Sequence, residues 1–136
     1  MINRLTDTLN FQTEALVLRS ERQRLIASNI ANADTPGYVA RDMDFARALR
    51  EATGQAQAVA PAATQARHLA VPGGAQAEAQ LMYTRPAQDN LDRNSVDMDR
   101  ERAAFADNTV KYEATLRFIN AQARTLLDAM KAPNQA

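Results

Sequence analysis

The last third of the sequence carries an almost unbroken heptad pattern of apolar residues. The pattern has two rows, Met98, Phe105, Tyr112, Ile119 and Leu126 in the first, and Thr109, Leu116, Ala123 and Met130 in the second. From Phe105 to Met130 the rows interleave at spacings of three and four residues, and Arg102 interrupts them in the preceding turn. This spacing predicts a long helix with one narrow apolar strip. A single helix cannot bury that strip alone, so the strip needs a partner from this chain or from another copy.

A second long helix is predicted from about Leu5 to Ala33, where no glycine or proline interrupts the chain. Its apolar residues form two neighbouring stripes, Phe11, Ala15, Leu18, Leu25 and Ile26 in one, and Leu5, Leu9 and Leu16 in the other. At about 1.5 Å per residue this helix would be roughly 45 Å long. The two helices could form the core of a monomeric helical domain. Because large apolar residues are few, the two helices cannot form a thick core alone. We expect the helices to pair with each other and also with other copies.

A turn is predicted to end the first helix within Asn29–Tyr38, whose sequence is NIANADTPGY. Pro36 disfavours the helical region for Thr35, and the pair Pro36-Gly37 suits the two central positions of a type II turn. Gly37 is therefore expected to have a positive φ.

Short elements are predicted in the middle of the chain. Val39, Met43 and Phe45 alternate with polar residues, which is typical of an extended stretch. Asp44 is expected to cap a short helix. The apolar face of that helix would consist of Phe45, Ala48, Leu49 and Ala52.

Residues 53–80 are rich in Ala, Gln, Gly and Pro and predict a flexible connector. A brief strand is predicted at residues 81–85, ended by Pro86. Asn94 is expected to be the N-cap of the last helix, which should end near Lys131, ahead of Pro133.

The predicted fold class is therefore mainly α. Two long terminal helices would pair as a coiled coil, with an irregular, partly extended middle between them. We expect three parts: an N-terminal helix in residues 1–35, a connector in residues 36–95 and a C-terminal helix in residues 96–136.

Composition excludes several classes of protein. The 136 residues include 16 Lys and Arg and 16 Asp and Glu, so the net charge is zero, which argues against nucleic-acid binding. The sequence has no cysteine, so neither a disulfide framework nor a thiolate metal site can form. The N-terminus lacks the apolar core of a cleaved signal peptide, and no run approaches the roughly 20 apolar residues of a membrane span.

Catalytic chemistry is not predicted. His68 lies in the Ala/Gln-rich stretch with no carboxylate or nucleophile beside it. The carboxylates Asp97, Asp99 and Glu101 fit the electrostatics of a helix N-terminus better than a cation site. Phosphate-binding, zinc-protease and serine-hydrolase motifs are all missing from the sequence. We therefore expect a protein without catalytic, metal or cofactor-binding residues, and not an enzyme.

The segment around the predicted turn resembles a signature shared by bacterial flagellar axial proteins, which form the rod and hook. The matching residues are Ser28, Asn29, Ile30, Ala31, Asn32, Thr35, Pro36, Gly37 and Tyr38. The segments Ala40–Phe45 and Val96–Tyr112 are similar to those of short proximal rod proteins, and the short chain length agrees. Two such short paralogous proteins are candidates, and these segments favour one of them. A soluble coiled-coil adaptor is the alternative from another class.

This resemblance implies a structural subunit that polymerises into a tube, its terminal helices forming the inner coiled-coil layer. It implies export through the flagellar type III apparatus and a place in the periplasmic rod. The implied partners are other copies, other rod proteins, and membrane-ring and export-gate components at the rod base. The expected assembly seam consists of Leu9, Leu16, Leu18, Leu25, Phe105, Tyr112, Leu116, Ile119, Leu126 and Met130.

Overall fold

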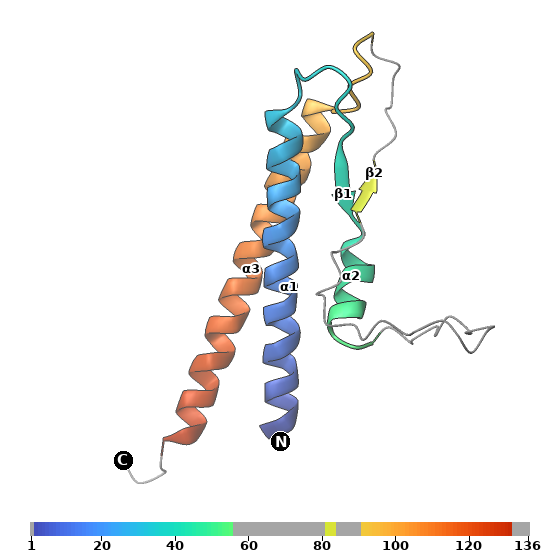
Figure 1. Ribbon diagram of the computed structural model, residues 1–136. Coiled ribbons are helices and arrows are strands. Elements are labelled where there is room, and N and C mark those ends of the chain that lie inside the picture. The colour runs from blue at the N-terminus through green and yellow to red at the C-terminus, as the bar shows by residue number, and fades with distance from the viewer. Residues whose placement is uncertain (1, 56–80, 84–90, 132–136) are drawn as a thin grey trace, which may run out of the picture.

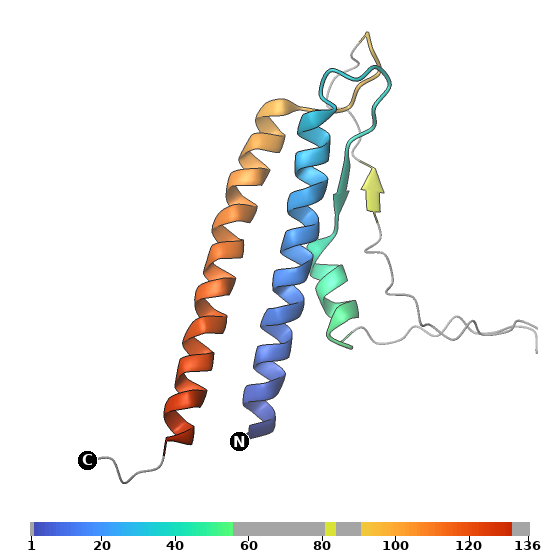
Figure 2. The ribbon, with the colours of Figure 1, turned by 60° about the vertical axis from the view of Figure 1, so that its left-hand side comes forward.

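Two long antiparallel helices dominate the computed structural model, which describes residues 2–55, 81–83 and 91–131. The elements follow in the order α1 (Ile2–Ala31), β1 (Arg41–Met43), α2 (Phe45–Ala52), β2 (Leu81–Tyr83) and α3 (Met98–Met130). α1 and α3 lie side by side, and the start of α1 is at the same end as the finish of α3 (Figure 1). α2 and β1 lie along α1 on the side away from α3, as Figure 2 also shows.

The helix α1 is therefore packed on two sides, although its core is thin. The buried apolar residues of the described chain are Ala15, Leu18, Ile26, Ala40, Met43 and Ala48. On the α2 side, the guanidinium of Arg19 lies 4.3 Å from the centroid of the Phe45 ring, and Arg22 forms an ion pair with Asp42 at 3.1 Å. The predicted fold class is confirmed: the chain is mainly α, with two long terminal helices and a partly extended middle.

The short middle elements follow the local sequence signals. The Asp44 carboxylate accepts a hydrogen bond from the backbone N–H of Arg47 at 3.1 Å, which confirms the predicted cap of α2. β1 pairs with β2 in antiparallel register, with Arg41 opposite Tyr83 and Met43 opposite Leu81. Residues 56–80, which include His68, and residues 84–90 lie outside the described chain.

The predicted cap of the last helix is wrong. The N-cap of α3 is Asp97, whose carboxylate accepts hydrogen bonds from the backbone N–H groups of Asp99 and Arg100 at 3.1 and 3.2 Å. Asn94, the expected cap, points instead toward the turn after α1, where its side-chain amide donates hydrogen bonds to the backbone carbonyls of Asn32 and Ala33. At its other end, α3 ends at Met130, in agreement with the predicted end near Lys131.

Neither long helix contains an apolar stretch sufficient to cross a bilayer, within the part of the chain that the structure describes.

Candidate functional site

The signature segment forms a tight turn after α1. The backbone N–H of Tyr38 donates to the carbonyl of Thr35 at 3.2 Å, and Gly37 has a φ of 73°, as the sequence predicted. A β-carbon added to Gly37 would have nothing within 4 Å. The requirement for glycine is therefore the left-handed backbone and not a shortage of space. The N–H of Gly37 also donates to the carbonyl of Asp92 at 2.8 Å, which ties the turn to the segment before α3.

Asn29 joins α1 to three other segments. Its Nδ2 donates to the carbonyl of Arg41 at 2.8 Å, and its Oδ1 accepts from the N–H of Arg41 at 3.0 Å. The same Nδ2 lies 3.2 Å from Oε2 of Glu101 on α3, and the hydroxyl of Tyr38 donates to Oδ1 at 3.2 Å. The side chain is 1% exposed, so these bonds are made in a site shielded from water. An amide is required because one group must both donate and accept.

Asn94 holds the turn from the opposite side. Its Nδ2 donates to the carbonyls of Asn32, Ala33 and Thr35 at 2.9, 2.8 and 2.8 Å. These carbonyls belong to the turn that follows α1. Asn94 therefore binds the backbone of a turn some sixty residues away in sequence.

Ser95 completes the connection between the turn and the last helix. Its N–H donates to the carbonyl of Tyr38 at 3.0 Å, and its Oγ accepts from the N–H of Ala40 at 2.7 Å. We call Asn29, Tyr38, Asn94, Ser95 and Glu101 the signature hub. The sequence signature contains the first two of these residues but not the other three, which are partners of the turn. Asn94 and Ser95 are polar residues just before α3, and Glu101 is a carboxylate in its first turn; their polarity is the one sequence signal that they give.

Glu101 is the unusual member of the signature hub because it is a buried carboxyl group. Burial raises the pKa of Glu101, and the nearby charge of Asp42 acts in the same direction. The hydrogen bond from Asn29 and the cations Arg100 and Arg22 oppose this shift without reversing it. Glu101 is thus not simply one of the carboxylates that complement the helix dipole, as its position in the first turn of α3 suggested.

The residues of the predicted assembly seam fall into three sets by their exposure in the isolated chain. Leu18 is buried at 7% exposure and belongs to the chain's own core. Phe105, Leu116 and Met130 are exposed on α3. The remaining seam residues are half-buried: Leu9, Leu16, Leu25, Tyr112, Ile119 and Leu126.

The apolar surface of α3 extends beyond that seam. Leu127 is 60% exposed and follows Phe105 and Leu116 at intervals of 11 residues. On a straight helix an interval of 11 residues returns nearly to the same face, so we call Phe105, Leu116 and Leu127 the exposed row. Val110 and Phe118 are also exposed. A search for heptads alone misses Leu127, Val110 and Phe118.

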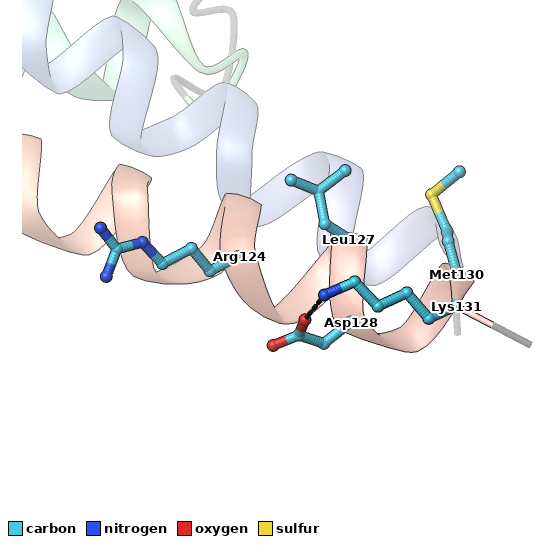
Figure 3. A pocket seen from close by; sticks show the side chains of 5 residues that line it. All are labelled: Arg124, Leu127, Asp128, Met130 and Lys131. Atoms are coloured by element: carbon cyan, nitrogen blue, oxygen red, sulfur yellow. Dashed lines mark hydrogen bonds and ion pairs between the residues drawn. The ribbon is translucent and has the colours of Figure 1, made fainter. Parts of the chain in front are cut away.

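A hollow of the surface lies at the end of α3 and is lined by residues of that helix and its cap: Arg124, Leu127, Asp128, Met130 and Lys131. Figure 3 shows Leu127 and Met130 projecting from the helix, with Lys131 and Asp128 joined by a 2.8 Å ion pair. This hollow is the open surface of one helix. Within the described ranges, no group of three or more His, Cys, Asp or Glu could hold a metal ion.

Comparison with known proteins identifies the class to which this helical hairpin and its turn belong. Residues 9–38, which cover most of α1 and the signature turn, match the family described as flagella basal body rod protein. The chain is 45% identical to the flagellar basal body rod protein FlgB of Proteus mirabilis strain HI4320, over 96% of this chain and 98% of that protein. It is 44% identical to FlgB of Salmonella typhimurium, over 98% of this chain and all of that protein.

The same near-complete coverage holds for FlgB of Escherichia coli K12, at 41% identity. The chain belongs to the FlgB family of flagellar basal body rod proteins. It is accordingly a structural subunit of the basal-body rod, and nothing in these relatives favours FlgC, the paralogous short rod protein that the resemblance left as an alternative.

Proposed function

We propose that this subunit polymerises through its two terminal helices into the proximal rod, the part of the drive shaft that joins the membrane ring and export gate to the distal rod. The observation that carries the proposal is the exposed row on α3. Its residues Phe105, Leu116 and Leu127 are 39%, 36% and 60% exposed on a helix that is already paired with α1. The row needs a partner that this chain's described residues do not supply.

A second copy is the partner that fits a row of this shape. Burying one Leu or Phe stabilises an interface by about 1.5–3 kcal/mol, and every subunit of a polymer would present the same row. The neutral net charge leaves little long-range repulsion between copies. The half-buried seam residues at the boundary between α1 and α3 would become fully buried when a neighbour packs there.

The signature hub would contribute by fixing the middle segment relative to the helical hairpin. Asn29 bonds β1, and Asn94 bonds the turn between α1 and β1, so β1 and α2 are held along one side of α1. The exposed row belongs to α3, on the other side of the molecule. Each subunit would then offer neighbours two different surfaces, one helical and one formed by the middle segment, as a tubular assembly requires.

The partners in this proposal are other copies of this chain, other rod proteins, and the ring and gate components at the rod base. The proposal also takes residues 1–35 and 96–136 as the coiled-coil layer of the tube and residues 36–95 as the segment outside it. The support is the resemblance of the signature together with the unpartnered apolar surface of α3.

The substitution Leu116→Asp tests the assembly role. The purified variant should keep the helical content of the wild type, because Leu116 is already exposed in the subunit. In the rod, the new carboxylate would be buried without a partner at every repeat, at a cost of several kcal/mol each. We expect loss of swimming and of isolable basal bodies. The control is Thr125→Asp, which adds the same charge at an exposed position of α3 on a face away from the exposed row. Normal swimming of the Leu116 variant would contradict the proposal.

A further inference from the structure

The face of α3 that packs most deeply against α1 is polar. Glu101, Asn108 and Thr115 are its buried residues, and they occupy one heptad position together with the half-buried Gln122. In paired helices this position usually carries Leu, Ile or Val. Here the apolar residues lie beside it, partly exposed, and polar side chains take the centre of the contact.

Asn108 lies at the middle of this polar contact and is 0% exposed. Its Nδ2 donates to the backbone carbonyl of Arg19 at 2.9 Å and to Oε1 of Gln23 at 2.6 Å. Gln23 in turn donates from Nε2 to the hydroxyl of Thr109 at 2.8 Å. The amide of Gln23 is thus held between two consecutive residues of α3, and it fits there in one axial position only.

A second polar contact between the helices agrees with the same alignment. Asn29 meets Glu101 near the turn, while Gln23 and Arg19 meet Asn108 further along. The partner on α1 moves back along the sequence as the partner on α3 moves forward, as antiparallel helices require. Two separated polar contacts therefore specify one register.

We propose that Asn108, through its hydrogen bond with Gln23, determines the register of the α1–α3 hairpin. A slip of one heptad moves one helix along the other by about 10 Å. It replaces Gln23, the side-chain partner of Asn108, by Leu16 or Ile30. The amide of Asn108 would then be buried against an apolar side chain, which disfavours both slipped states.

The apolar residues of the hairpin do not discriminate in this way, because one heptad of apolar contacts resembles the next. A buried amide in an otherwise apolar helix pair is known to select one alignment at some cost in stability. Asn108 Oδ1 is buried without a hydrogen-bond partner among the described residues, which agrees with a contact selected for alignment rather than strength. A single register would place the exposed row at the same axial position in every subunit. This consequence for assembly rests on the proposed function, whereas the proposed register does not.

Distance measurement between spin labels tests this inference on the full purified chain. The sequence has no cysteine, so Ser20→Cys with Thr125→Cys places one label on an exposed site of each helix, offset along the hairpin axis. Labelled chains are diluted with unlabelled ones so that only distances within one chain are recorded. The chain with native Asn108 should give one narrow distance peak. In Asn108→Leu we expect a second peak, displaced by up to about 10 Å, with helical content equal or higher.

Gln23→Leu removes the other partner of the contact and should also produce the displaced peak. Asn120→Leu is the matched control, since it makes the same substitution on an exposed face of α3 and should leave the single peak unchanged. Unchanged single peaks in both Asn108→Leu and Gln23→Leu would overturn the proposal. So would a distribution that broadens without a displaced peak, because Asn108 would then hold the helices together without selecting their alignment. The absence of a narrow peak with native Asn108 would contradict it as well.

Discussion

Single amide side chains connect segments of this molecule that are distant in sequence. Asn29, Asn94 and Asn108 are each buried, and each donates to a backbone carbonyl on another segment. A carboxylate of the same shape could only accept hydrogen bonds, so Asp cannot replace Asn at these positions. The sequence motif reveals only Asn29, because the other two residues lie outside the turn that they support.

Asn94→Asp is expected to destabilise the subunit. A carboxylate would face the carbonyls of Asn32, Ala33 and Thr35 in place of the donating amide. We expect the free energy of unfolding to fall by about 1–3 kcal/mol, the range for leaving buried polar groups unpaired. Urea denaturation followed by circular dichroism measures it. The exposed substitution Asn120→Asp should change stability little, and equal effects of the two substitutions would show that Asn94 has no special role.

Glu101→Gln is expected to stabilise the subunit at about pH 7. The raised pKa of Glu101 means that the folded state favours the protonated carboxyl, so this group's contribution to stability is largest in acid and is lost as pH rises through the folded pKa. Glutamine is neutral at every pH and can still accept from Asn29. The difference in unfolding free energy between variant and wild type should therefore narrow from about pH 7 to about pH 4. A difference that is independent of pH would contradict the conclusion that burial of the Glu101 carboxyl raises its pKa.

At the scale of elements, local chemistry made the helices, the short strands and the turn predictable. Absence of glycine and proline defined α1, Asp44 capped α2, and Pro36-Gly37 placed the turn. The cap of α3 was not predictable in the same way. Asn and Asp are equally good caps, and the choice of Asp97 follows because Asn94 is engaged by the turn after α1, a contact that no local pattern contains.

The centre of the α1–α3 contact was also not predictable from hydrophobicity. The heptad pattern assigns Phe105 and Leu116 to the apolar strip, which was expected to be the contact face. The structure instead buries Asn108 and Thr115 and leaves Phe105 and Leu116 exposed. A sequence rule that puts apolar residues inside assumes that all burial occurs within one chain. Burial of polar residues and exposure of apolar ones is expected for a subunit whose apolar surface packs against neighbouring subunits.

The turn between α1 and β1 should tolerate asparagine at position 37 but not valine. Gly37 has a positive φ, which asparagine adopts with little strain and a β-branched residue does not. We expect Gly37→Val to lower the unfolding free energy by about 1–2 kcal/mol or more and to impair swimming, and Gly37→Asn to affect both less. Gly54 is not a neutral comparison, because it also has a positive φ, of 69°. If the valine and asparagine variants behave alike at equal expression, the left-handed conformation is not what the turn requires.

At the scale of the whole molecule, the subunit combines a weakly packed hairpin with a well-bonded turn. The signature hub has dense hydrogen bonding, whereas the far ends of α1 and α3 are mostly exposed or half-buried. Such a distribution suits a part that gains much of its stability from neighbours. Stiffness of a shaft would then come from many inter-subunit contacts, each modest, repeated along the rod.

The most direct measurement compares the accessibility of one residue of the exposed row before and after assembly. Leu116→Cys introduces the chain's single thiol, and this conservative change should preserve motility. A maleimide reagent is applied to the purified chain and to isolated basal bodies, and the modified peptide is quantified by mass spectrometry. We predict rapid labelling of the free chain and strong protection in the basal bodies, because α3 packs there against neighbouring subunits. Equal labelling in the two samples would contradict the account, since the exposed row would then face solvent in the rod as well.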